Sequence, residues 1–125
     1  MSKYNYCDVF NSLEYKTGVA VFMKKNGDMR VMLATRNVDT IEKLGIGNMY
    51  GKMLSYSNRC NQGNGNIPVM DIILADARTI NVDRLLAFEP IGVINTQEDL
   101  NNACGVYKKY VSAYKPDRVN NIEEL

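Results

Sequence analysis

The sequence contains no histidine and no tryptophan. Histidine is the commonest general base and the commonest metal ligand, so its absence removes the usual means of acid–base and metal-assisted catalysis. The only cysteines are Cys7, Cys60 and Cys104. Because they are odd in number and far apart, they predict free thiols in a reducing compartment, and no histidine is present to activate them. We therefore expect a protein that is not an enzyme and that has no cofactor.

The carboxylates do not suggest a metal site. Asp71, Asp76 and Asp83 are the candidates for Mg²⁺ ligands, but their spacing matches no known metal-binding loop. Asp83 also lies in a predicted turn, where a short acidic side chain has a structural role. We expect no bound metal.

An excess of charge and a long apolar run are also missing. The net charge is +1, so no global field draws the chain onto nucleic acid or an anionic membrane. An anion site would have to come from local clustering. No apolar run approaches the roughly 20 residues of a membrane span, and residues 1–10 lack the apolar core of a signal peptide. We expect no membrane partner.

The strongest structural signal is a hairpin over residues 19–35, with Asn26-Gly27 at its centre. This dipeptide predicts a two-residue type I′ turn, which would place Val21 opposite Met32 and Met23 opposite Arg30. Both faces of the hairpin are then mostly apolar, so both need cover, as they have in a small closed or nearly closed barrel.

The 125 residues form one domain. We expect a mainly β protein with a C-terminal helix (α+β), built as a small SH3-like or Sm-like barrel of about five strands. Its parts are an N-terminal arm or short helix over 1–17, a barrel core over 18–94 with a long loop over 46–66, a helix over 95–115, and a tail over 116–125. Within the core we expect a short helix ending at Leu44, a strand over 69–74, a tight turn over 75–78, a 3₁₀ turn over 82–84, and a strand over 85–89.

The expected helix over 95–115 has one apolar face, formed by Leu100, Ala103, Cys104, Tyr107 and Val111. Three of its tyrosines, Tyr107, Tyr110 and Tyr114, are candidates for contact with a partner protein. Packing in the protein's own core is the alternative for the same side chains.

Two segments resemble a family of small tailed-phage proteins described as WYL-like, which have an Sm-like or SH3-type β-barrel. The segments are VAVFMKKNGDMRVMLATRNVDTI (19–41) and IPVMDIILADARTINVDRLLAFE (67–89). The first is similar to the family's apolar strand, Lys-Lys-Asn-Gly turn and Arg-Val-Met strand. The second is similar to its valine-rich strand and its Asn-Val-Asp-Arg turn. The resemblance implies a barrel fold, a phage origin and a location in the host bacterial cytoplasm. More distant WYL domains resemble sensors that bind nucleic acid or nucleotides on basic barrel residues.

Arginines flank the predicted strands. If the barrel brings Arg30, Arg36, Arg78 and Arg84 together, with Lys24 and Lys25 nearby, their guanidinium groups form a phosphate site without a P-loop. The alternative is that each is solvated or paired with a neighbouring carboxylate such as Asp28, Asp76 or Asp83. In the long loop, Tyr50 and Tyr56 are candidates to stack on a base, with Lys52 between them.

Three functional hypotheses follow. The first is a non-enzymatic phage protein that sequesters a nucleotide-derived ligand, such as a host immune signal, and so acts against bacterial defence. The second is a protein-interaction module that inhibits a host enzyme through its helix and tail. The third is an Sm-like protein that binds short RNA. Open strand edges make a homo-oligomer plausible in all three cases.

Overall fold

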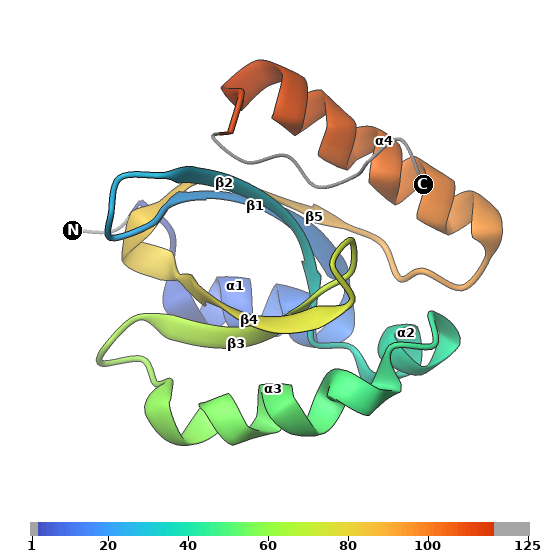
Figure 1. Ribbon diagram of the computed structural model, residues 1–125, viewed down its shortest axis with the longest axis horizontal. Helices are drawn as coiled ribbons and strands as arrows, with labels where there is room; N and C mark the ends of the chain where they lie inside the picture. The colour runs from blue at the N-terminus through green and yellow to red at the C-terminus, as the bar shows by residue number, and fades with distance from the viewer. Residues whose placement is uncertain (1–2, 117–125) are drawn as a thin grey trace.

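The computed structural model of the protein describes residues 3–116. A five-stranded antiparallel sheet in the order β4-β3-β2-β1-β5 forms its centre (Figure 1). The strands are β1 (Thr17–Met23), β2 (Met29–Thr35), β3 (Asn66–Asp71), β4 (Asp76–Asn81) and β5 (Leu85–Ile91). The α-helices are α1 (Tyr6–Tyr15), α2 (Val38–Lys43), α3 (Tyr50–Tyr56) and α4 (Gln97–Tyr114). Single 3₁₀ turns are η1 (Gly47–Met49), η2 (Ser57–Arg59) and η3 (Val82–Arg84).

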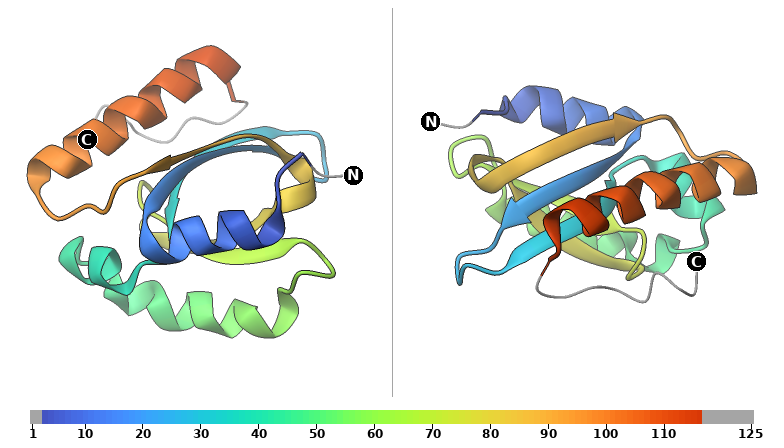
Figure 2. Two further views of the ribbon diagram at one scale, coloured as in Figure 1. Left: turned by 180° about the vertical axis from the view of Figure 1, so that it is seen from behind. Right: turned by 90° about the horizontal axis from the view of Figure 1, so that it is seen from above.

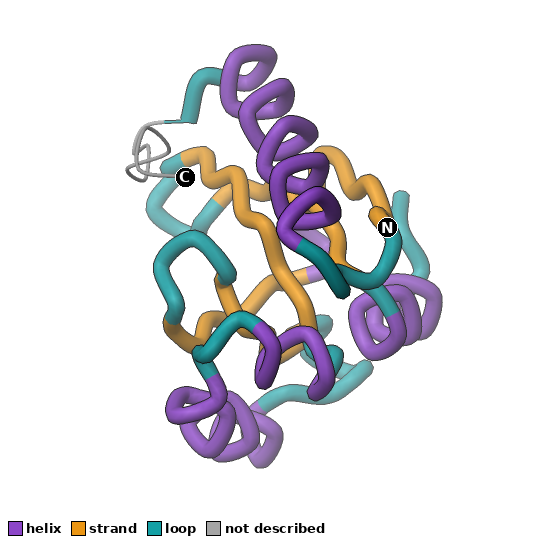
Figure 3. The backbone as a smooth tube through the Cα atoms, turned by 90° about the vertical axis from the view of Figure 1, so that its right-hand side faces the viewer, coloured by secondary structure: helices purple, strands orange, loops and turns teal. Residues whose placement is uncertain are grey.

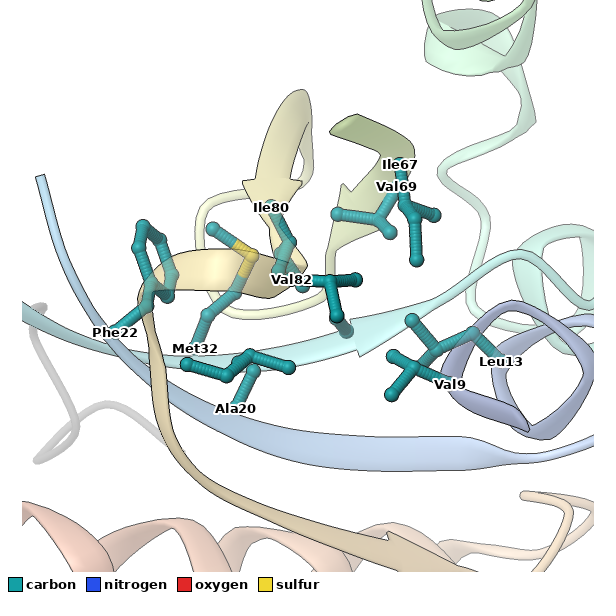
Figure 4. Close-up of a cluster of buried hydrophobic side chains, with 11 residues drawn as sticks. Val9, Leu13, Ala20, Phe22, Met32, Ile67, Val69, Ile80 and Val82 are labelled. Carbon is teal, nitrogen blue, oxygen red and sulfur yellow. The ribbon is translucent and has the colours of Figure 1, made fainter. Parts of the chain in front are cut away.

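The sheet curls into a small barrel, so that β3 and β4 face β1 and β2 across an apolar interior (Figure 1). Figure 4 shows labelled side chains from α1, β1, β2, β3, β4 and η3 pointing into this interior. The buried residues of this cluster are Val9, Leu13, Ala20, Phe22, Met32, Ala34, Ile67, Val69, Ile80, Val82 and Leu85. The predicted fold class, a mainly β barrel of five strands with a C-terminal helix, is confirmed.

Helices cover the outside of the barrel (Figures 2 and 3). Helix α4 lies across β1 and β2, and α3 packs on β3 and β4. The outward residues of the hairpin, Val19, Val21, Val31 and Leu33, share a buried cluster with Ala103, Cys104 and Tyr107 of α4. Helix α1 contributes Val9 and Leu13 to the barrel interior. The hairpin is therefore covered on both faces, as its apolar pattern predicts.

The predicted register of the β1–β2 hairpin is wrong by one residue. Val21 pairs with Val31, and Phe22 pairs with Arg30. The cause is a three-residue loop in which the Gly27 N–H donates to the Lys24 carbonyl (2.9 Å) and the Lys24 N–H donates to the Asp28 carbonyl (2.8 Å). Gly27 has a φ of +93°, whereas Asn26 is not among the described residues with positive φ, so the turn is not type I′. This geometry matches a type I turn followed by a glycine bulge.

Of the two alternatives predicted for the N-terminal segment, an arm or a short helix, the structure has the helix, α1. The Asn5 side chain accepts a hydrogen bond from the Asp8 N–H and caps the helix. Val9 and Leu13, four residues apart, are buried on the barrel.

The predicted long loop over 46–66 is also wrong, because it contains α3. Met53 is buried on the outer face of the sheet with Met70 and Ala77, and this packing supplies the stability that the glycine-rich sequence lacks. The remaining turn is ordered by Asn64. Its Oδ1 accepts from the N–H groups of Asn61 (3.1 Å) and Asn66 (3.0 Å).

The predicted strand over 69–74 and turn over 75–78 are displaced. Strand β3 ends at Asp71, the turn spans 72–75, and β4 begins at Asp76. The Asp71 Oδ1 atom accepts from the N–H groups of Ile73 (3.0 Å) and Leu74 (3.1 Å), which ends the strand. By contrast, the predicted 3₁₀ turn over 82–84 is confirmed, and so is the short helix before Gly45, which Asn37 caps.

Helix α4 matches the predicted helix over 95–115 within two residues at each end. Thr96 and Asp99 form a capping box at its start, and Lys115 ends it with a φ of +50°. Residues 117–125 of the predicted tail lie outside the described residues.

Candidate functional pocket

A pocket of about 350 Å³ lies between the β1–β2 hairpin and β4. One wall comes from the end of the hairpin, and the opposite wall comes from β4 and η3, with residues of β3 between them. The lining residues are Phe22, Met23, Lys24, Lys25, Arg30, Val31, Met32, Asn66, Asp71, Arg78, Thr79, Asn81 and Arg84. The volume is in the range of small-molecule sites. Three of the four predicted arginines, Arg30, Arg78 and Arg84, therefore meet at one pocket.

Arg30 is placed at this pocket by the observed register. Its cross-strand partner Phe22 belongs to the barrel interior, so the arginine side chain lies on the same face. Its Nε atom is buried and has no hydrogen-bond partner within the described residues. A buried guanidinium nitrogen without an acceptor is energetically costly, and an anionic ligand would remove that cost.

Arg78 is held in place by Asp76. Its NH1 atom donates to the Asp76 Oδ2 atom (2.8 Å) and to the Ala77 carbonyl (2.9 Å). The other oxygen of Asp76 accepts from Lys52 Nζ (2.8 Å). The hydrogen bond from Lys52, followed by that from Arg78, lowers the pKa of Asp76 to about 2. Arg78 is thus already paired, and it offers a ligand only its remaining N–H donors.

The other cations of the pocket are Lys24, Lys25 and Arg84. Arg84 is exposed on η3, and within the described residues none of the three forms an ion pair or a side-chain hydrogen bond. Asp71 is the carboxylate among the lining residues. The pocket is therefore locally cationic in a chain whose net charge is only +1, which is the local clustering that the sequence requires for an anion site.

Asp71 is almost fully buried, with 3% of its surface exposed. Burial raises its pKa, against the lowering effects of the backbone hydrogen bonds from Leu74 and Ile73 and of the charges of Arg78 and Arg30. Since its Oδ1 atom is bonded to two backbone N–H groups, its role in the described structure is to close the β3–β4 turn.

Arg36 does not lie at the pocket, contrary to the predicted set. It is 9% exposed and connects α1 to the barrel. Its NH1 atom donates to the Pro68 carbonyl, its Nε atom donates to Glu14 (3.3 Å), and its guanidinium lies 4.5 Å from the centre of the Phe10 ring. The side chain points to the opposite end of the interior because α1, rather than solvent, covers the end of β2.

The loop residues predicted to bind a ligand, Tyr50, Tyr56 and Lys52, are also outside the pocket lining. All three belong to α3, where both tyrosines pack against the cluster around Met53. Arg59 lies over the Tyr56 ring at 4.9 Å. Lys52 influences the pocket only indirectly, through its ion pair with Asp76.

The predicted partner contacts on α4 change as well. Tyr107 is 1% exposed and packs under the helix, so it is a core residue and not an accessible contact. Tyr110 and Tyr114 are half-buried and stacked on each other. The Tyr110 hydroxyl donates to Glu89 (2.7 Å), and this hydrogen bond, with burial, raises the pKa of Tyr110 to about 12.

Sequence reasoning missed several residues of the pocket. Phe22 and Met32, on the interior face of the hairpin, form its apolar part, and Met23 and Asn66 also line it. Phe22 and Met32 could have been found from the alternation of β1 and β2, had the turn type been known. No local signal marks Asn66 or Val31, because their position depends on which strands pair.

Comparisons of the chain with protein-family models, with curated proteins and with solved structures returned no match. The resemblance to WYL-like phage proteins therefore stays a prediction. Within residues 3–116, no helix is long and apolar enough to cross a bilayer. The same residues contain no group of three or more acidic or cysteine side chains positioned to hold a metal ion.

Proposed function

We propose that the protein binds a small phosphorylated ligand of the nucleotide class in the pocket between the β1–β2 hairpin and β4. The observation that carries this proposal is Arg30, whose buried Nε atom has no acceptor in the described structure. Arg84, Lys24 and Lys25 line the same pocket and have no carboxylate partner within residues 3–116. Guanidinium groups bind phosphate oxygens in bidentate fashion, which suits this arrangement.

The apolar side chains of the pocket favour a ligand with a flat organic part over a simple anion. Phe22 and Met32 line the pocket together with the cations, and thioether and aromatic groups pack well on a planar heterocycle. Neither predicted stacking tyrosine contributes, so the base would pack on methionine and phenylalanine instead.

The proposed mode of action is binding without chemical conversion. Asp71, the carboxylate of the lining, is occupied by two backbone N–H groups and is a poor general base in that position. In biological terms, binding would sequester a nucleotide-derived signal. That role, like the phage origin and the host cytoplasm, derives from the sequence resemblance and is part of the proposal.

Isothermal titration calorimetry with pyrophosphate, AMP and ADP at low salt tests the proposal. The variant Arg30→Gln should bind about 10- to 100-fold more weakly, which is the value of hydrogen bonds to a buried charge. Arg59→Gln is the matched control, because Arg59 lies on η2 against Tyr56 and outside the pocket. Absence of heat with every ligand at millimolar concentration would refute the proposal, and so would equal affinities of the two variants.

Short RNA is the alternative occupant, and one feature of the sheet favours it. The strands β4 and β5 are the two outer strands of the sheet, so copies of the chain can join edge to edge and align their pockets. Light scattering measures the subunit number, and a steep salt dependence of oligonucleotide binding would distinguish RNA from a mononucleotide. Inhibition of a host enzyme through α4 has less support, since Tyr107 is buried.

A further inference from the structure

The backbone of Val31 faces away from β1. In an antiparallel pair, residues alternate between those that bond to the partner strand and those whose N–H and C=O groups point to the other side. The Leu33 carbonyl accepts from the Ile72 N–H (2.9 Å), so Leu33 points away from β1. Val31, two residues earlier, points the same way. The Lys24–Asp28 hydrogen bond at the turn makes Asp28 point towards β1, and alternation from Asp28 along β2 again makes Val31 point away from β1.

Among residues 3–116, no strand pairs with Val31 on that side. β3 pairs with β2 only at Ala34 and Thr35, and beyond these residues it has turned away towards β4. Within the described residues, no hydrogen bond to the backbone N–H or C=O of Val31 is present. Yet Val31 is only 6% exposed. The packing of its side chain under α4 accounts for this burial, and backbone groups without a protein partner have to be satisfied by water or by a ligand.

The unpaired groups of Val31 lie at the pocket. Val31 lines the pocket, while its side chain packs in the cluster under α4 on the outer face of the sheet. It is therefore the backbone of Val31 that borders the cavity. The next residue towards the turn is Arg30, so the backbone donor and acceptor of Val31 line the same pocket as the guanidinium whose Nε atom lacks an acceptor.

We infer that the N–H and C=O groups of Val31 bind the edge of the ligand's base, while the cations bind its phosphate. This inference rests on the proposed function and names the contact that would select a nucleotide over other phosphorylated molecules. A base edge carries a donor and an acceptor side by side, such as the amino group and the neighbouring ring nitrogen of adenine. The ring nitrogen accepts from the Val31 N–H, and the amino group donates to the Val31 carbonyl.

An extended peptide is a poorer occupant of the same edge. Strand addition needs outward-facing residues in succession, so that several main-chain hydrogen bonds form. On β2 the next such residue towards β3 is Leu33, whose carbonyl already accepts from Ile72. Arg78 and Thr79 of β4 close the far side of the pocket. The space beside Val31 therefore suits the edge of a small heterocycle.

The variant Val31→Pro removes the N–H donor without breaking the β1–β2 ladder, because that N–H points away from β1. Val31→Ala is the matched control, since it loses the same packing under α4 and keeps the N–H group. Calorimetry compares AMP with ribose 5-phosphate, which has the phosphate and the sugar but no base. In the wild type and in Val31→Ala, AMP should bind about tenfold more tightly than ribose 5-phosphate, and in Val31→Pro this advantage should be lost.

A measurement on the wild-type protein keeps the test valid if Val31→Pro does not fold. In a ¹⁵N–¹H NMR spectrum, the amide of Val31 should shift and its hydrogen exchange should slow with AMP, but not with ribose 5-phosphate. An unchanged Val31 amide under saturating AMP would overturn the inference. If both ligands bind equally well, the base contact is refuted and the phosphate site stands; if neither binds, the proposed function itself fails.

Discussion

Replacing Arg36 with methionine tests the assignment of this arginine to the scaffold. Methionine preserves most of the apolar stem and removes the guanidinium. The change leaves the buried Pro68 carbonyl without its donor and removes the contact with the Phe10 ring, at 4.5 Å. The ion pair with Glu14 is lost as well, but the Glu14 side chain is 36% exposed and this pair contributes little.

The expected loss in the free energy of unfolding follows from these contacts. A hydrogen bond from a charged donor to a buried carbonyl contributes about 1.5–3 kcal/mol, and a partly desolvated cation–π contact contributes about 1 kcal/mol. Relief of the cost of burying the charge offsets part of this loss. We expect Arg36→Met to lower the free energy of unfolding by about 3 kcal/mol, a large share of the stability of a domain of this size.

Urea denaturation followed by circular dichroism measures the effect as a lower midpoint at constant m-value. Glu14→Gln is the control, with an expected loss below about 1 kcal/mol. Binding of AMP to folded Arg36→Met should equal that of the wild type, because Arg36 lies outside the pocket. The reasoning fails if Arg36→Met is as stable as Glu14→Gln, or if it folds normally and loses the ligand.

Two further predictions concern the packing of β1 and the charge pair beside the pocket. Gly18→Ala should lower the free energy of unfolding by about 1–3 kcal/mol, because a Cβ atom would lie 2.7 Å from Cε1 of Phe88. A Cβ atom at Gly51 on α3 meets nothing within 4 Å, so Gly51→Ala should raise the free energy of unfolding by a few tenths of a kcal/mol. Thermal melting of the two variants checks this, and equal shifts in Tm would contradict it. The pKa of Asp76 is lowered to about 2 from 3.8, so its stabilising effect is present above that ordinary value and is lost as the pH falls towards 2. The difference in free energy of unfolding between the wild type and Asp76→Asn, measured by urea titration, should therefore be largest near neutral pH and should shrink between about pH 4 and pH 2. A difference that does not change with pH would show that the carboxylate is unpaired in solution.

The sequence by itself determined those features that depend on neighbouring residues. Helix α4, which Thr96 and Asp99 cap, helix α2, which Asn37 caps, and the 3₁₀ turn before β5 all lie in the segments where they were expected. Such signals are local hydrogen bonds, so the chain needs no tertiary contact to specify them. The apolar character of both faces of the hairpin likewise predicted that both would be covered.

The tertiary structure alone decided which residues share the pocket. A glycine bulge at Gly27 shifts the hairpin by one residue, and because side chains alternate along a strand, this shift moves Arg30 onto the face of Phe22. Arg36, six residues later and equally basic, is taken up by α1 and Pro68 instead. The backbone of Val31, which has no partner within residues 3–116, has no sequence signal at all, since β3 and β2 share only two residue pairs.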